Sequence, residues 1–166
     1  DTLRFNITFG MEAPDLEVLE AVRIARFDSV LERLESGLET NIAEKGVNLS
    51  GGEKQRLALA RGIFFSHDSQ VVLLDEPTSS VDTFNERQIY QNLLELYRGR
   101  CMVSAIHKLH LLPLFDRIYV FEDGQVVEAG DWTTLIASTG PLSRLWHNYQ
   151  ATERSEAMSD PVRLDE

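Results

Sequence analysis

Residues 49–56 have the sequence Leu49-Ser50-Gly51-Gly52-Glu53-Lys54-Gln55-Arg56. Ser50 followed three positions later by Glu53 is a capping box, which predicts that a helix begins here. Gly51 and Gly52 fall in its first turn, although glycine costs a helix about 1 kcal/mol relative to alanine. Glycine is suited to positions where another group approaches the backbone closely, because it has no side chain. The first amides of a helix have no partner within the helix and favour an anion such as phosphate. The stretch predicts an anion-binding helix tip, and a purely structural cap after a glycine turn stays open on this motif alone.

A second landmark follows at Val71-Val72-Leu73-Leu74-Asp75-Glu76-Pro77. The apolar run predicts a buried strand of a parallel sheet, with two carboxylates at its carboxyl end. Open α/β sheets bind their ligands at that end. The helix that begins at Ser50 should lie between the two landmarks, and its buried face is predicted from helical spacing to be Leu57, Leu59, Ala60, Ile63 and Phe64.

Together these stretches resemble the nucleotide-binding domain of ATP-binding-cassette (ABC) proteins. Residues 49–53 match the signature motif of that family, and residues 71–76 match its Walker B motif with the adjacent catalytic glutamate. Residues 79–82 match the D-loop, and His107 matches the switch histidine. The resemblance covers about residues 1–150. It implies an α/β, P-loop NTPase-like fold, of which this chain would hold the helical subdomain and the C-terminal half of the parallel-sheet core.

The resemblance also implies a division of the chain. Residues 1–65 would form the helical subdomain with the signature motif and signature helix. Residues 66–150 would form the C-terminal half of the ATPase core, with Walker B, the D-loop and the switch histidine. Residues 151–166 are polar with scattered charge, and we expect a loosely ordered tail there.

Local patterns predict the remaining elements. Alternating apolar residues would by themselves favour a strand near residues 3–7, but the family resemblance favours a turn or short helix. A helix is expected over residues 14–26, with the apolar stripe Leu16, Leu19, Val22 and Ala25. Ser29 and Glu32 form a second capping box, which predicts a helix ending near residue 37. Further on we expect a helix that begins within residues 83–86 and ends at residue 99, followed by a buried strand at residues 102–106. A hairpin should turn at Asp123-Gly124. Short helices are expected at residues 132–137 and 142–149, with Trp132 and Trp146 as their packing anchors.

Composition limits the possible functions. The chain has 166 residues and a formal net charge of −11, which disfavours a nucleic-acid surface. The single cysteine, Cys101, heads an apolar run, so we expect a buried structural thiol. No apolar run approaches the roughly 20 residues of a membrane helix. We therefore expect the chain as it stands to be soluble.

The segment Thr40-Asn41-Ile42-Ala43-Glu44-Lys45-Gly46 resembles the X-loop of exporter-type ABC domains, which couples to the transmembrane domains. Ala43 and Lys45 stand where that family usually has glycine and arginine. The resemblance implies transmembrane domains as partners, export as the function, and a location at the cytoplasmic face of a membrane.

A P-loop is not found in the sequence. That motif requires a Gly-Lys pair, and the chain contains none. The aromatic adenine contact and the Q-loop glutamine of the family have no match either, since they lie upstream of residue 1. These observations suggest a truncation, and we expect the chain alone not to turn over ATP.

The resemblance implies ATP and Mg²⁺ as cofactors and a second nucleotide-binding domain as partner, in a homodimer or a heterodimer. In the family, each ATP lies between Walker A of one domain and the signature motif of the other. The residues implied for nucleotide binding and for contact between the two sites are Ser50, Gly51, Gly52, Glu53 and Asp82. Asp75 would hold Mg²⁺, usually through water. Glu76 would orient the attacking water, and His107 would contact the γ-phosphate.

Two alternatives come from other classes of protein. The first is a non-transporter ABC ATPase that acts on DNA or ribosomes. The acidic charge, the X-loop-like segment and the single short domain count against it. The second is a non-hydrolysing interaction module that lends its signature surface to a partner, which the missing P-loop favours for the isolated chain.

Overall fold

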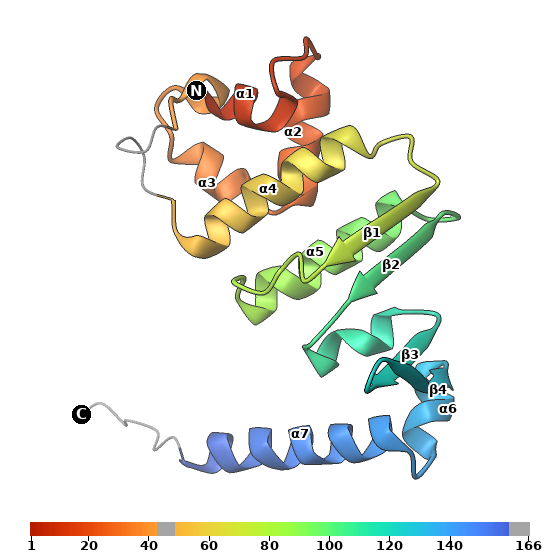
Figure 1. Ribbon diagram of the computed structural model, residues 1–166. Helices are drawn as coiled ribbons and strands as arrows, with labels where there is room; N and C mark the ends of the chain where they lie inside the picture. Colours follow the sequence, from red (N-terminus) through yellow and green to blue (C-terminus); the bar gives the residue numbers. More distant parts are fainter. Residues whose placement is uncertain (43–48, 160–166) are drawn as a thin grey trace, which may run out of the picture. The chain divides into compact units, whose positions relative to one another are not determined.

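The computed structural model describes residues 1–42 and 49–159. Contacts divide the chain into two compact units, Asp1–Ala105 and Ile106–Glu166 (Figure 1). The boundaries predicted from the sequence, after residues 65 and 150, stay predictions.

The first unit begins with a group of short helices: α1 (Leu3–Thr8), α2 (Asp15–Ile24), α3 (Asp28–Glu32), the 3-10 turn η1 (Gly37–Glu39) and α4 (Gly51–Phe65). Helices α1 and α2 both pack against α4. The buried face of α4 is Leu57, Leu59, Ala60 and Ile63, with Phe64 partly buried, as predicted. The short helix expected near residues 3–7 is confirmed as α1.

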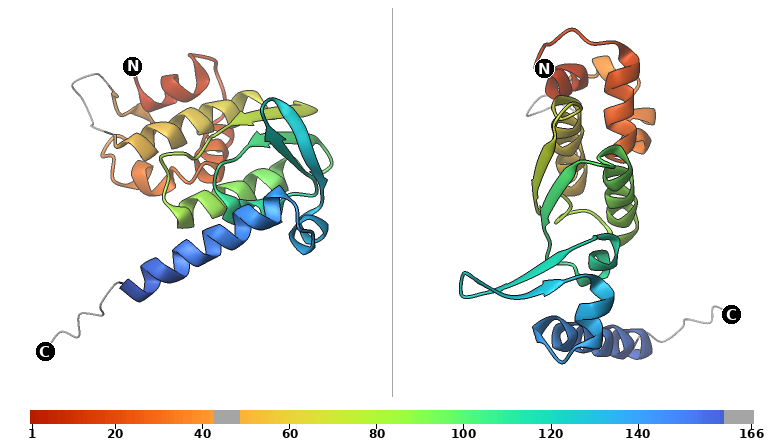
Figure 2. Two further views of the ribbon diagram at one scale, coloured as in Figure 1. Left: turned by 60° about the horizontal axis from the view of Figure 1, so that its bottom comes forward. Right: turned by 90° about the vertical axis from the view of Figure 1, so that its right-hand side faces the viewer.

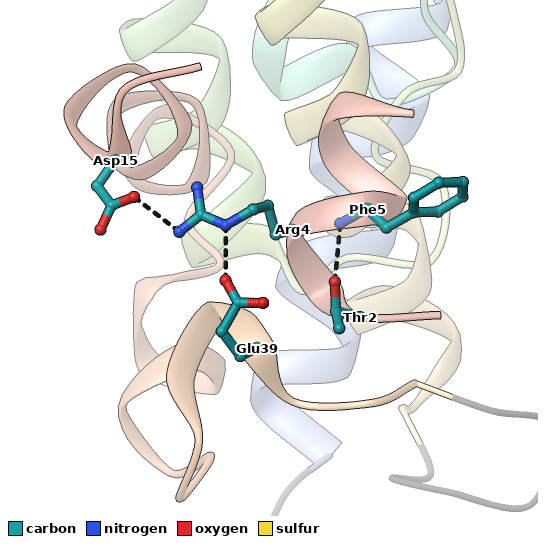
Figure 3. A network of polar contacts seen from close by, with 5 residues as sticks. All are labelled: Thr2, Arg4, Phe5, Asp15 and Glu39. Atoms are coloured by element: carbon teal, nitrogen blue, oxygen red, sulfur yellow. Dashed lines mark hydrogen bonds and ion pairs between the residues drawn. The ribbon is translucent and has the colours of Figure 1, made fainter. Parts of the chain in front are cut away.

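Polar contacts hold α1 in place (Figure 3). Thr2 caps the helix, since its hydroxyl accepts a hydrogen bond from the amide of Phe5 at 3.1 Å. The guanidinium of Arg4 donates to Glu39 at 2.6 Å and to Asp15 at 2.7 Å. The hydrogen bond to Glu39, followed by that to Asp15, raises the pKa of Arg4. One side chain therefore joins α1 to the start of α2 and to η1.

Two predictions for this region are wrong in detail. Of the stripe predicted for α2, Val22 and Ala25 are buried, but Leu16 and Leu19 are exposed and Val18 and Ala21 are buried in their place. Both stripes fit a helical period, and packing against α4 selects the second. Ser29 does not cap a helix, because α3 begins one residue earlier, after Phe27, without a side-chain cap. Phe27 is fully buried, so apolar packing fixes the start of α3.

The two-stranded parallel sheet of the first unit joins β1 (Val71–Asp75) to β2 (Cys101–Ala105). Val71 pairs with Cys101 at one end and Asp75 with Ala105 at the other. Helix α5 (Thr83–Leu96) connects the strands and lies along one face of the pair (Figure 2). Val72 is buried on that face. This confirms the predicted parallel pairing and the helix between the strands.

The opposite face of the sheet carries exposed apolar side chains. Val71, Leu73 and Val103 are 58%, 75% and 53% exposed, and Cys101 is exposed as well. The predictions of a fully buried strand and of a buried thiol are therefore wrong for the part of the chain that the structure describes. The reason is the two-residue alternation of a strand, since only every second side chain faces α5.

The second unit contains η2 (Leu109–Leu114), the antiparallel hairpin of β3 (Ile118–Glu122) and β4 (Gln125–Gly130), α6 (Trp132–Ala137) and α7 (Pro141–Ser159). Asp123 and Gly124 both have positive φ, as a two-residue hairpin turn requires. Trp132 and Trp146 meet edge to face at 4.9 Å, which confirms them as packing anchors. The loosely ordered tail expected from residue 151 is wrong up to residue 159, because α7 continues that far.

One face of the β1–β2 sheet is covered and the other is exposed, so substitutions on the two sides should differ in their effect on stability. Leu93 of α5 is fully buried, whereas Leu73 of β1 is 75% exposed. Leu93→Ala should lower the free energy of unfolding of the chain by about 2–5 kcal/mol, because it removes packed core atoms. Leu73→Ala should change it by about 0.5 kcal/mol or less. Urea denaturation of both variants measures the difference, and equal losses would contradict the exposure of this face.

Candidate functional site

Ser50 and Glu53 form the predicted capping box at the start of α4. The Ser50 hydroxyl accepts from the Glu53 amide at 3.3 Å, and the Glu53 carboxylate accepts from the Ser50 amide at 2.8 Å. Ser50 and Gly51 are exposed. The first amides of α4 have no partner within the helix and lie at the positive end of its dipole. The helix tip can therefore receive an anion from solvent.

Glu53 is tied to a second helix. Arg33, just after α3, donates to its carboxylate at 2.5 Å. Burial by itself raises the pKa of Glu53, but the hydrogen bond from the Ser50 amide and the charge of Arg33 outweigh it, so that the pKa lies below its ordinary value. Glu53 thus stays ionised at neutral pH and stiffens the helix tip. The Glu53 carboxylate therefore binds two groups of this chain, the Ser50 amide and the Arg33 guanidinium.

Gly52 lies against the loop that follows β1. A β-carbon at residue 52 would lie 2.5 Å from the carbonyl oxygen of Ser80, which leaves no room for a side chain. At Gly51 the nearest such atom is the Ser80 β-carbon at 4.0 Å, an ordinary contact. The two glycines therefore differ. Gly52 is required by backbone packing within the protein, while Gly51 remains accessible at the helix tip.

Asp75 and Glu76 lie at the carboxyl end of β1, and both are exposed. Glu76 has φ of 44°, a left-handed conformation that is uncommon for a residue other than glycine. Its carbonyl accepts from the Ser79 amide at 3.3 Å, which closes a tight turn through Pro77. The chain therefore leaves the strand abruptly, directly after the two acids.

Gln55, which the sequence analysis did not single out, joins α4 to this turn. Its side-chain nitrogen donates to the Glu76 carbonyl at 3.0 Å and to the Ser79 hydroxyl at 2.9 Å. Its side-chain oxygen accepts from the Ser80 amide at 2.8 Å. No local pattern marks this residue, because its three partners lie 21 to 25 positions away. Only the folded structure identifies it.

Asp82 is the N-cap of α5. Its carboxylate accepts from the amide of Asn85 at 3.0 Å and from the Asn85 side chain at 2.8 Å. The side-chain bond, followed by the backbone bond, lowers the pKa of Asp82. The sequence predicts that Asp82 lies in the D-loop and that the helix begins after it. An aspartate directly before a helix is the signal that would have identified the cap.

Buried polar groups hold the loop after β1 against α5. Thr78, which is buried, donates to the buried carboxylate of Glu86 at 2.5 Å. The hydroxyls of Tyr90 and Ser104 lie 2.9 Å apart. Burial raises the pKa of Tyr90. These contacts join the loop after β1 to α5, and α5 to β2.

The remaining predicted positions are His107 and the X-loop-like segment. His107 is exposed, belongs to the second unit, and comes two residues after the end of β2 in the sequence. Its contact with a phosphate stays a prediction. Residues 43–46 of the X-loop-like segment lie outside the described residues.

Within residues 1–42 and 49–159, no three His, Cys, Asp or Glu side chains form a cluster that could hold a metal by themselves. Mg²⁺ bound with a nucleotide needs only one or two protein carboxylates, because phosphates and waters supply the other ligands. Asp75, an exposed carboxylate at a strand end, fits that requirement.

Comparisons with known proteins identify the family of the chain. The sequence model of the family described as "ABC transporter" matches residues 7–79. The chain is 40% identical over 151 residues to the ATP-dependent lipid A-core flippase 1 of Colwellia psychrerythraea, which covers 90% of this chain and 25% of the flippase. It is 37% identical over 166 residues to ATP-binding cassette sub-family B member 6 of Xenopus tropicalis, over 99% of this chain and 19% of that protein.

A solved structure agrees as well. The structure of a bacterial Atm1-family ABC exporter with ATP bound superposes with a TM-score of 0.78 at 32% identity, over 90% of this chain and 26% of that chain. The fold and the site thus define an ABC-type ATPase fragment. The chain belongs to the ABC transporter family, and the solved structure that it resembles is that of an ABC exporter.

The chain spans between 19% and 26% of the length of these relatives. In the part of the chain that the structure describes, no helix is both long enough and apolar enough to cross a bilayer.

The difference between the two glycines can be tested in the chain. Gly52→Ala should lower the free energy of unfolding by about 1–3 kcal/mol, because the new methyl group overlaps the Ser80 carbonyl. Gly51→Ala should be neutral or stabilising by up to about 1 kcal/mol, since alanine favours the helix. Chemical denaturation measures both. A Gly52→Ala variant as stable as the wild type would refute the close packing.

The ionised Glu53 predicts a dependence of stability on pH. Its pKa is lower in the folded chain than the ordinary 4.5, so its stabilisation is present above about pH 4.5 and is lost as the pH falls through the folded-state value. Glu53→Gln should keep the capping box, cost less than about 1 kcal/mol at neutral pH and weaken the acid dependence. Glu53→Ala should cost about 1–2 kcal/mol. Denaturation between about pH 3 and about pH 7 checks this, and an unchanged acid limb in Glu53→Gln would contradict it.

Proposed function

We propose that this chain is part of the nucleotide-binding domain of an ABC exporter, in which two such domains bind ATP between them and hydrolyse it to drive transmembrane export. One observation carries the proposal: the signature tip and the Walker B acids belong to one compact unit and are joined directly through Gly52 and Gln55. The exporter relatives and the exporter structure with bound ATP support it.

In this proposal, the helix tip and the strand end act on different nucleotides. The Ser50 hydroxyl and the amides of Gly51 and Gly52 bind the γ-phosphate of ATP seated on the partner domain. The tip suits this role because it is exposed and carries the positive end of the α4 dipole. Glu53 contributes by holding the cap rigid.

Glu76 orients and polarises the water that attacks the γ-phosphate of ATP bound by its own domain, and His107 contacts that phosphate. Asp75 holds Mg²⁺, and waters and phosphates supply the other ligands of that ion. Bound Mg²⁺ supplies charge neutralisation for phosphoryl transfer. Asp82 links the two nucleotide sites across the interface of the two domains, and its capping of α5 fixes its own backbone.

The partners follow from the same proposal. A second nucleotide-binding domain supplies the Walker A motif that faces Ser50. Transmembrane domains, contacted in part through residues 40–46, receive the motion at the cytoplasmic face of a membrane. The net charge of −11 favours this function over an ABC ATPase that acts on nucleic acid.

The proposal is tested by Glu76→Gln in the full-length transporter. The substitution removes the carboxylate but keeps the size of the side chain, so ATP turnover should fall by about 100-fold or more while ATP-driven association of the domains persists. Steady-state phosphate release and size-exclusion chromatography with ATP measure the two effects.

Asp68→Asn is the matched control, because Asp68 is a fully exposed carboxylate in the turn between α4 and β1. It should leave turnover unchanged. Retained turnover in Glu76→Gln would remove Glu76 from catalysis. A wild-type transporter that binds its partners but does not hydrolyse ATP would support the interaction module instead.

A further inference from the structure

Gln55 lies on the same face of α4 as Gly52, three residues further along the helix. Gly52 brings the helix backbone against Ser80, and Gln55 then bonds to the loop on either side of that contact. The side chain is half-buried and has no place among the residues assigned to the nucleotide. Its three hydrogen bonds therefore need a separate explanation.

The geometry uses both ends of the amide. The side-chain oxygen faces the N–H of Ser80, and the side-chain nitrogen faces the carbonyl of Glu76. Exchanging the two amide atoms would set N–H against N–H and oxygen against oxygen. These two backbone groups therefore fix the orientation of the amide, and a donor and an acceptor are required together.

The backbone that Gln55 holds is an unusual one. Glu76 has a left-handed φ of 44°, and such residues persist only where their surroundings determine them. The Glu76 carbonyl accepts from Gln55 at 3.0 Å and from the Ser79 amide at 3.3 Å. Of these two bonds, only the one from Gln55 reaches Glu76 from another element of the fold.

We propose that Gln55 is a positioning residue that fixes the backbone of Glu76 relative to the helix tip at Ser50. This inference rests on the proposed function, in which the tip serves the nucleotide on the partner domain and Glu76 serves the nucleotide of its own domain. Gln55 then joins the two nucleotide sites mechanically within one domain. Movement of the tip on ATP binding is transmitted to the catalytic carboxylate.

The test uses Gln55→Met in the full-length transporter. Methionine has nearly the length and helix propensity of glutamine, but it has no donor and only a weakly accepting sulfur. We expect kcat for ATP to fall by about 10- to 100-fold, because a small displacement of a catalytic group is enough for such a loss. KM should change less than kcat. Gln55→Glu, which keeps the acceptor for Ser80 and loses both donors, should show the same loss of kcat.

The matched control is Gln91→Ala. Gln91 is an exposed glutamine of α5 that bonds to Gln88 at 3.0 Å, and its loss should leave kcat unchanged. Hydrogen exchange of the full-length protein gives an independent readout. The segment 76–82 should exchange about 5-fold faster in Gln55→Met, because the Ser80 amide has lost its acceptor.

The outcomes separate the inference from the function on which it rests. Wild-type kcat in Gln55→Met or in Gln55→Glu, in a transporter that Glu76→Gln inactivates, overturns the role of Gln55 alone. A lower melting temperature with unchanged kcat per folded molecule also overturns it, because the role is then only structural. If Glu76→Gln itself retains turnover, the proposed function fails.

Discussion

The arrangement of this protein depends on the direct contact between the first turn of α4 and the loop after β1. At Gly52 the two backbones lie so close that no β-carbon fits between the helix and the Ser80 carbonyl. Gln55 adds three hydrogen bonds to the same loop. Because protein interiors deform little, a contact of this kind makes the helix and the loop move together. The exposed helix tip and the pair of strand-end carboxylates thereby become parts of one rigid assembly.

Much of the fold was predictable where a local pattern has a single physical explanation. The capping box at Ser50, the Asp-Gly turn of the hairpin and the parallel strand ending in acids are of this kind. The stripe of α2 was not predictable, because Leu16 and Val18 each begin an acceptable helical pattern and tertiary packing decides between them. An apolar run such as residues 71–74 predicts burial but does not identify which residues cover each face of the strand.

The candidate site was predictable in its chemistry and less so in its geometry. Residue types and spacing predicted Ser50, Asp75 and Glu76 as candidates, and the structure shows that they share one unit and are exposed. The same patterns could not assign Gly52 to packing or any role to Gln55. These properties arise from contacts between residues far apart in the sequence, such as that of Gln55 with Ser80, and such contacts have no period or motif.

The choice of glutamine at residue 55 follows from what the loop requires. One side chain must accept from a backbone N–H and donate to a backbone carbonyl at the same time. A serine or threonine is too short for this, and a lysine offers no acceptor. A glutamate would offer two acceptors and would repel the Glu76 carbonyl. It would also add a negative charge beside Asp75 and Glu76, where the proposed function brings phosphates. A neutral amide satisfies both backbone groups without that charge, and so it can hold the left-handed turn at Glu76 while leaving the field of the carboxylates unchanged.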